Sequence, residues 1–195
     1  MNSGYSAQFY CEALVRTAQQ LPCSTIDRVA DVLLDAHYHK NAIYLFGNGG
    51  SAALASHFAC DLGKGTVNGS GHRFRVLSLT DNVPLMTAWA NDSHYEHIFA
   101  EQLENFVRKR DVAFAISGSG NSPNVLNALR TARRAGAVTI GLTGFRGGQM
   151  KGLCDVCVIV PSDNMQIIED LHLCITHALF TNIRSKLQHH STQCA

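Results

Sequence analysis

Residues 42–51 read AIYLFGNGGS, a short apolar run that ends in glycine, asparagine and serine. An uninterrupted apolar run of this length is typical of a strand buried on both faces, as in parallel sheets. The turn Gly47–Ser51 leads into an apolar stretch that predicts a helix over Ala52–Leu62. Strand, glycine-rich turn and helix in this order predict the first unit of an α/β fold.

The same alternation continues toward the C-terminus. Strands are predicted at Arg75–Leu79, Asp111–Ile116, Val138–Leu142 and Val156–Val160, and helices at Asp81–Trp89, His94–Val107, Pro123–Ala135 and Asn164–Leu187. Five short strands alternating with helices predict a doubly wound, three-layer α/β/α sandwich around a mostly parallel five-stranded sheet.

Two helices are predicted before the first strand. Ala7–Gln20 and Thr25–His39 carry apolar residues at three- and four-residue spacing, which indicates helices with one buried face. We expect residues 1–40 to form an N-terminal helical pair that packs on the domain or on another subunit. Residues 41–188 then form the α/β domain, and residues 189–195 are expected to be a frayed tail.

Composition excludes several classes of protein. The 195 residues are 46% hydrophobic, which disfavours disorder, and 16 basic residues balance 15 acidic ones, which disfavours a nucleic-acid-binding face. No apolar run approaches the roughly 18 residues of a membrane span. Seven cysteines, an odd number, and an N-terminus unlike a secretory signal predict reduced thiols in the cytoplasm.

Two of these cysteines form the motif Cys154-Asp155-Val156-Cys157. This spacing occurs in redox and zinc sites. The motif also leads into a predicted strand, and burial of ordinary thiols along that strand is the simpler explanation.

Two turns rich in glycine and small polar residues follow predicted strands. They are Gly47–Ser51 and Ser117–Ser122, and each precedes a helix. Parallel sheets bind ligands beyond the carboxyl ends of their strands, and free N–H groups at a helix start attract phosphate. One alternative is that both turns are simply tight connections between a strand and a helix. A dinucleotide site is another, because Gly47, Gly49 and Ala52 fit G-x-G-x-x-A and Asp81 follows the next strand.

Imidazoles and carboxylates lie on two of the predicted helices. His57 and Asp61 are four residues apart and share a helix face. Glu169 and His177 on the last helix differ by about 80° around the axis and about 12 Å along it. These four side chains predict either a zinc site or the acid and base of a proton transfer. Asn91-Asp92 is expected in a loop, either as a simple turn or as a contact to sugar hydroxyls.

Several longer motifs resemble one known family. They are Gly47-Asn48-Gly49-Gly50-Ser51-Ala52-Ala53, His57-Phe58-Ala59, Ala90-Asn91-Asp92, Ser119-Gly120-Asn121-Ser122-Pro123-Asn124-Val125, Gly141-Leu142-Thr143-Gly144 and Val160-Pro161-Ser162-Asp163. Together they resemble the sugar isomerase (SIS) domain, and specifically the phosphoheptose isomerases. The resemblance implies an aldose–ketose isomerase that converts sedoheptulose 7-phosphate to D-glycero-D-manno-heptose 7-phosphate through an enediol.

The resemblance also implies residue roles and an assembly. Phosphate is held by Ser51, Ser117, Gly118, Ser119 and Ser122, and the sugar by Asn48, Gly49, Gly50, Asn91, Asp92 and Glu169. A divalent metal, zinc in this family, is bound by His57, Asp61, Glu169 and His177, of which Asp61 and His177 are the acid/base pair. The N-terminal helices belong to a homotetramer.

Three residues depart from the family pattern. The family usually has Glu at Asp61, Gln at Glu169 and Thr at Gly118. Some SIS proteins are not catalytic, such as the DnaA initiator-associating protein, so binding of a partner protein or of a phosphosugar alone is the alternative function.

Overall fold

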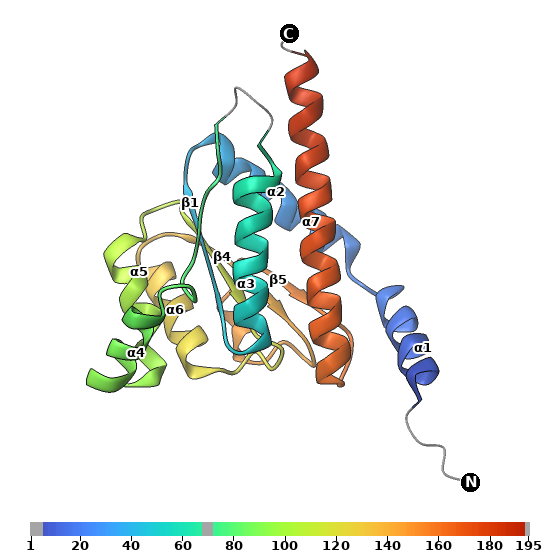
Figure 1. Ribbon diagram of the computed structural model, residues 1–195, viewed down its shortest axis with the longest axis horizontal. Coiled ribbons are helices and arrows are strands. Elements are labelled where there is room, and N and C mark those ends of the chain that lie inside the picture. The colour runs from blue at the N-terminus through green and yellow to red at the C-terminus, as the bar shows by residue number, and fades with distance from the viewer. Residues whose placement is uncertain (1–5, 68–71, 194–195) are drawn as a thin grey trace.

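The computed structural model describes residues 6–67 and 72–193, with side chains described as far as His189. Its centre is a five-stranded sheet in the order β2-β1-β3-β4-β5 (Figure 1). The strands are β1 (Ala42–Gly47), β2 (Arg75–Ser78), β3 (Val112–Ile116), β4 (Val138–Thr143) and β5 (Val156–Ile159). All four neighbouring pairs are parallel, which confirms the predicted doubly wound sheet.

Within the described residues, seven α-helices accompany the sheet. They are α1 (Ala7–Ala18), α2 (Cys23–Tyr38), α3 (Gly50–Cys60), α4 (Val83–Asp92), α5 (Ala100–Phe106), α6 (Pro123–Arg134) and α7 (Met165–Gln193). Helices α2, α3 and α7 pack on one face of the sheet and α5 and α6 on the other, which gives the predicted three layers (Figure 1).

The strands supply both cores because successive side chains point to opposite faces. Ile43 and Leu45 of β1 pack under α2, α3 and α7, whereas Tyr44 and Phe46 pack under α5 and α6. Every residue of β1 and β3 is buried, as the uninterrupted apolar runs predict.

Helix boundaries differ from the predictions at two places. The single helix expected over His94–Val107 is wrong: a 3-10 turn at Tyr95–His97 precedes α5. Ile98 and Phe99 lie between the two segments, and both are buried, with the ring of Phe99 5.5 Å from the ring of Phe46 on β1. Helix α7 continues past the expected end at Leu187 to Gln193, so most of the expected frayed tail is helical. Residues 194–195 lie outside the described residues.

The N-terminal helices differ in how they pack. Helix α2 has seven buried residues, whereas α1 has none and projects from the rest of the molecule (Figure 1). Tyr10 of α1 donates a hydrogen bond to Asp170 Oδ2 of α7 (2.6 Å), and this bond with the carboxylate raises the pKa of Tyr10 to about 12.

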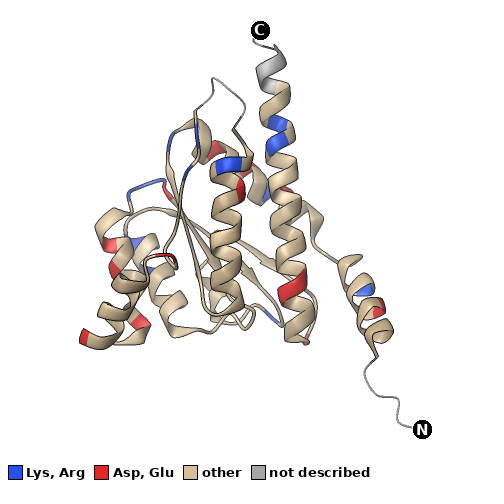
Figure 2. Cartoon of the chain, in the orientation of Figure 1, with Lys and Arg blue, Asp and Glu red and all other residues tan. Residues whose placement is uncertain are grey.

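Charged side chains are scattered over the helices and loops rather than collected on one element (Figure 2). Within the described part of the chain, no helix is both apolar enough and long enough to cross a bilayer.

Candidate active site

The two glycine-rich turns lie next to each other at the carboxyl edge of the sheet. Gly47–Ser51 joins β1 to α3, and Ser117–Ser122 joins β3 to α6. Strands β1 and β3 are paired through Gly47 and Ile116, which places the first and second turn side by side. A Cβ atom on Gly47 would lie 2.6 Å from the Ile116 carbonyl oxygen, so this close approach requires glycine.

Asparagine side chains connect the two turns. Asn48 Nδ2 donates to Asn124 Oδ1 (2.9 Å), and Asn124 Nδ2 donates back to Asn48 Oδ1 (2.8 Å). Tyr95 Oη also donates to Asn48 Oδ1 (3.0 Å). A pocket of about 600 Å³ opens between Asn48, Ser122 and the 3-10 turn with Tyr95. Asn124 and Tyr95 had no predicted role, although Asn124 lies within one of the quoted motifs.

The hydroxyl groups of the turns lie close together at the helix starts. Ser117 Oγ lies 3.4 Å from Ser122 Oγ, and Ser51 and Ser117 are both buried. Ser119 Oγ accepts from the Asn121 backbone N–H, which shapes the second turn. Neither turn contains Lys or Arg, so the groups available to an anion are hydroxyls and backbone N–H groups.

Three of the four predicted metal ligands converge at one point. His57 Nε2 lies 3.1 Å from His177 Nε2 and 3.4 Å from Asp61 Oδ2, and His177 Nε2 lies 3.9 Å from Asp61 Oδ2. His57 is on α3, Asp61 begins the π-helical turn Asp61–Gly65 that extends α3, and His177 is on α7. We refer to these side chains as the His57–Asp61–His177 cluster.

A glycine allows the two helices to approach at this cluster. A Cβ on Gly65 would lie 2.7 Å from the ring of Phe180, which is one turn beyond His177 on α7. The absence of a side chain at Gly65 therefore lets α7 pack against the π-helical turn and brings His177 to Asp61. Turns of this kind are frequent at functional sites.

The cluster fits a divalent metal ion. Zinc bonds of about 2.0–2.1 Å in a tetrahedral site place two ligand atoms about 3.3 Å apart, close to the separations in the cluster. The atom Asp61 Oδ2 is buried and has no hydrogen-bond partner among the described residues, although buried oxygens normally have one. The donor set of two imidazoles and one carboxylate suits zinc.

Glu169 lies apart from this cluster. It faces the start of α3, where a Cβ on Gly50 would lie 3.5 Å from Glu169 Oε2. Glu169, Ser51 and His57 line a second pocket of about 260 Å³ between α3 and α7. Glu169 is thus positioned between the first turn and His57, and it does not belong to the group of ligand atoms that lie within 4.8 Å of one another.

Comparisons with known proteins agree with this geometry. The family model described as the SIS domain matches residues 9–144. The phosphoheptose isomerase of Bradyrhizobium sp. (strain ORS 278) is 38% identical over 164 residues, covering 84% of this chain and 82% of its own. The phosphoheptose isomerase structure from Neisseria gonorrhoeae superposes with a TM-score of 0.84 at 30% identity, over 90% of this chain and 95% of its own.

The chain belongs to the SIS domain family, among the phosphoheptose isomerases. The resemblance inferred from the motifs is therefore confirmed. A probable phosphoheptose isomerase of Thermoplasma acidophilum is 37% identical over 186 residues, covering 92% of this chain and 98% of its own, so the similarity extends beyond the motifs.

Relative to the family pattern, Gly118 has a structural explanation. A Cβ at this position would lie 2.5 Å from Met165 Sδ, the first residue of α7. Met165 thus occupies the space that a larger side chain at this position would need. The carbonyl oxygen of Gly118 accepts bonds from the Gly144 backbone N–H and Thr143 Oγ1, which fix the second turn on the end of β4.

Asn91 and Asp92 do not lie in a loop, as predicted, but in the last turn of α4. Asn91 Nδ2 donates to Asp92 Oδ1 (2.8 Å), and both side chains are exposed. Asn82 caps the start of this helix and Pro84 occupies its first turn, and Asn91 and Asp92 are the last of its ten residues. Their contact with the sugar stays a prediction.

His172 of α7 is a buried imidazole behind the second pocket. It is 1% exposed, and neither ring nitrogen has a hydrogen bond of normal geometry within the described residues. Burial lowers the pKa of His172 to about 4, and the nearby Thr143 backbone opposes this effect only in part. The ring is therefore neutral at pH 7.

The low pKa of His172 predicts loss of stability in acid. The unfolded chain takes up a proton on His172 below about pH 6.5 and the folded chain only near pH 4, so stability falls progressively over this interval. Between about pH 7.5 and about pH 5, His172 is expected to reduce the free energy of unfolding by about 2 kcal/mol. Urea titrations measure this loss, which should be absent in His172→Asn and unchanged in the exposed control His189→Asn. If His172→Asn lost as much unfolding free energy in acid as the wild type, groups other than His172 would be responsible for the loss.

Proposed function

We propose that this SIS protein isomerises sedoheptulose 7-phosphate to D-glycero-D-manno-heptose 7-phosphate. The observation that carries the proposal is the His57–Asp61–His177 cluster, which combines a carboxylate with two imidazoles. Helix α3 leads from the first glycine-rich turn to this cluster. His57 and Ser51 line the same pocket, so a ligand anchored at the first turn reaches the cluster.

The phosphate group is assigned to the two turns. Ser51, Ser117, Ser119 and Ser122 supply hydroxyls, and the N-terminal ends of α3 and α6 supply favourable helix dipoles. The two hydrogen bonds between the Asn48 and Asn124 side chains hold the turns in a fixed relation, so both turns bind the same phosphate group without rearrangement. The carbon chain then extends toward α7, with Asn48, Gly49, Gly50 and Glu169 beside it.

Asp61 is assigned as the base. Its carboxylate removes the proton from C1 of the ketose, and an enediol forms. His177 transfers a proton between the oxygens on C1 and C2, and Asp61 returns its proton to C2 to give the aldose. A metal held by His57, Asp61 and His177, with Glu169 as a candidate fourth ligand, supplies Lewis-acid polarisation of the substrate oxygens when bound.

Zinc binding to the cluster has a measurable consequence. A ligand that binds only the folded state at about 100 times its Kd stabilises the protein by about 2.7 kcal/mol. Adding zinc to the chelator-treated protein is therefore expected to raise Tm by several degrees, with one ion bound per chain by metal analysis. His57→Ala should lose the shift and the ion, whereas His39→Ala, on the surface at the end of α2, should keep both. An equal shift in both variants would place the ion elsewhere.

We further propose a cytoplasmic homotetramer in which residues 1–40 contribute the subunit contacts. Helix α1 has no buried residue in the single chain, and it exposes about half of the surface of Phe9 and Val15. Apolar side chains on a projecting helix favour contact with another subunit.

The isomerase proposal is tested by turnover in deuterated water. The zinc-supplied protein is incubated with sedoheptulose 7-phosphate, and NMR is expected to show the aldose with solvent deuterium at C2. Fructose 6-phosphate serves as a shorter ketose for comparison. If no ketose phosphate is converted and none exchanges hydrogen, while sugar phosphates still bind, the protein is a binding protein of the non-catalytic SIS type.

A further inference from the structure

Cys154 and Cys157 lie together on the face of β4, away from the proposed isomerase site. Cys157 is on β5 directly opposite Gly141 of β4. A Cβ on Gly141 would lie 2.7 Å from Cys154 Sγ and 3.3 Å from Cys157 Sγ, so the missing side chain makes room for both sulfur atoms. Both sulfur atoms thus lie beside the same position on β4, and both side chains are partly accessible.

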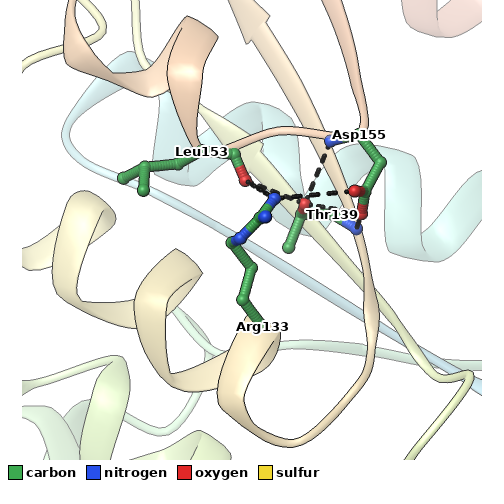
Figure 3. A network of polar contacts seen from close by, with 4 residues as sticks. All are labelled: Arg133, Thr139, Leu153 and Asp155. Carbon is green, nitrogen blue, oxygen red and sulfur yellow. Dashed lines mark hydrogen bonds and ion pairs between the residues drawn. The ribbon is translucent and has the colours of Figure 1, made fainter.

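The backbone on both sides of Cys154 is fixed by a polar network (Figure 3). The Leu153 carbonyl oxygen accepts from Arg133 Nη1 and from Thr139 Oγ1, each at 3.0 Å. The Asp155 carboxylate accepts from the Thr139 backbone N–H (2.8 Å) and Oγ1 (2.9 Å), and it pairs with Arg133 at 3.5 Å. These bonds hold Cys154 above Cys157 independently of any bond between the sulfurs.

The two thiols are chemically unequal. Hydrogen bonding by Cys154 lowers the pKa of the Cys157 thiol against the opposing effect of burial, and the nearby Lys151 ammonium also lowers it. The same hydrogen bond and burial raise the pKa of Cys154. A thiol with a lowered pKa beside a thiol with a raised pKa is the arrangement of a nucleophilic and a resolving cysteine.

We propose that Cys154 and Cys157 form a redox-active dithiol that exchanges with low-molecular-weight disulfides such as glutathione disulfide. The Cys157 thiolate attacks one sulfur of the disulfide, forms a mixed disulfide and releases one thiolate. Cys154 loses its proton to solvent, and its sulfur attacks Cys157 Sγ and releases the second thiolate; both released thiolates then take up protons from solvent. The dithiol gives up two electrons, and the external disulfide takes up two electrons and two protons.

The short distance along the chain favours a reversible bond. A disulfide that closes a loop of only four residues removes little entropy from the unfolded chain, so it contributes little to folding stability. Disulfides that are partly exposed and not needed for folding are the ones that exchange readily.

The proposal is tested on the full-length protein in glutathione redox buffers of increasing oxidising strength. Remaining thiols are trapped by alkylation, and peptides are mapped by mass spectrometry. We expect an internal Cys154–Cys157 disulfide that forms and is reversed by reduction, at buffer ratios where the exposed Cys11 and Cys23 carry at most glutathione adducts. Cys154→Ser should instead accumulate a glutathione adduct on Cys157.

A kinetic measurement tests the unequal thiols separately. At pH 7, Cys157 is expected to react with iodoacetamide several-fold faster than Cys154. Cys154→Ala removes the hydrogen-bond donor and should slow the alkylation of Cys157, whereas Cys154→Ser keeps a donor and should slow it less. Thermal unfolding checks that each variant is folded. Absence of the internal disulfide at every buffer ratio, or faster alkylation of Cys154 than of Cys157, would overturn the proposal.

Discussion

Replacing Asp61 by Asn is expected to lower kcat for sedoheptulose 7-phosphate about 1000-fold, while the affinity for the sugar phosphate stays within a few-fold of wild type. Asparagine keeps the size of the side chain but removes the proton acceptor, and a positioned base contributes roughly 100- to 10,000-fold. The phosphate is held by the two turns, which this substitution leaves intact. Turnover and equilibrium binding, measured on the same preparation, separate the two effects.

Two control variants make the Asp61 experiment specific. Asp31→Asn removes an exposed carboxylate that pairs with Lys186 on the far part of α7, and it should leave turnover unchanged. Asp61→Glu restores the residue usual in the family and is expected to retain activity, since the longer carboxylate reaches the same proton. Metal analysis of each variant distinguishes loss of the base from loss of the ion. If Asp61→Asn kept more than about a tenth of the wild-type kcat, another residue would be the base.

Replacing Gly120 by Ala is expected to destabilise the protein by about 2–4 kcal/mol and to weaken phosphate binding at least about tenfold. Gly120 has φ +66°, a left-handed conformation that disfavours a side chain. Its Cβ would lie 2.3 Å from the Gly147 carbonyl oxygen and 2.8 Å from the Gly147 carbonyl carbon. Both are backbone atoms, so the second turn must move, and the serine hydroxyls move with it.

The matched control is Gly152→Ala. Gly152 lies in the 3-10 turn Gln149–Gly152, and apart from its own turn and chain neighbours no heavy atom of the described residues lies within 4 Å of the position its Cβ would take. Urea unfolding and calorimetric titration with inorganic phosphate should leave Gly152→Ala close to wild type and shift Gly120→Ala in both measurements. Equal midpoints and affinities for the two variants would show that the second turn tolerates a side chain.

Local sequence patterns predicted most of the fold. The inner strands were predictable because a buried parallel strand must be apolar throughout, as at Ala42–Phe46. The helix at Pro123 was predictable because proline suits the first helical turn. The region after Trp89 was not predictable in this way. Whether Ile98 and Phe99 continue a helix depends on the core that both must reach, and no short window of sequence contains that core.

Part of the candidate site was also predictable. The two turns were expected at the carboxyl ends of their strands. The direct pairing of β1 with β3, which places the turns side by side, was not predicted, because alternation of strands and helices does not fix the strand order. The hydrogen bonds that join them were not expected, because Asn48, Tyr95 and Asn124 belong to three separate segments. Gly118 likewise became interpretable only when Met165 was found beside it.

The amino-acid sequence by itself determined the order of strands and helices, the two serine- and glycine-containing turns, and the spacing that puts His57 and Asp61 on one helix face. These features depend on periodicity and backbone conformation over a few residues. Only the tertiary structure decided that His177 joins His57 and Asp61 while Glu169 faces Gly50. That outcome depends on where α7 lies against α3, which the packing of Phe180 over Gly65 and of the shared apolar core determines.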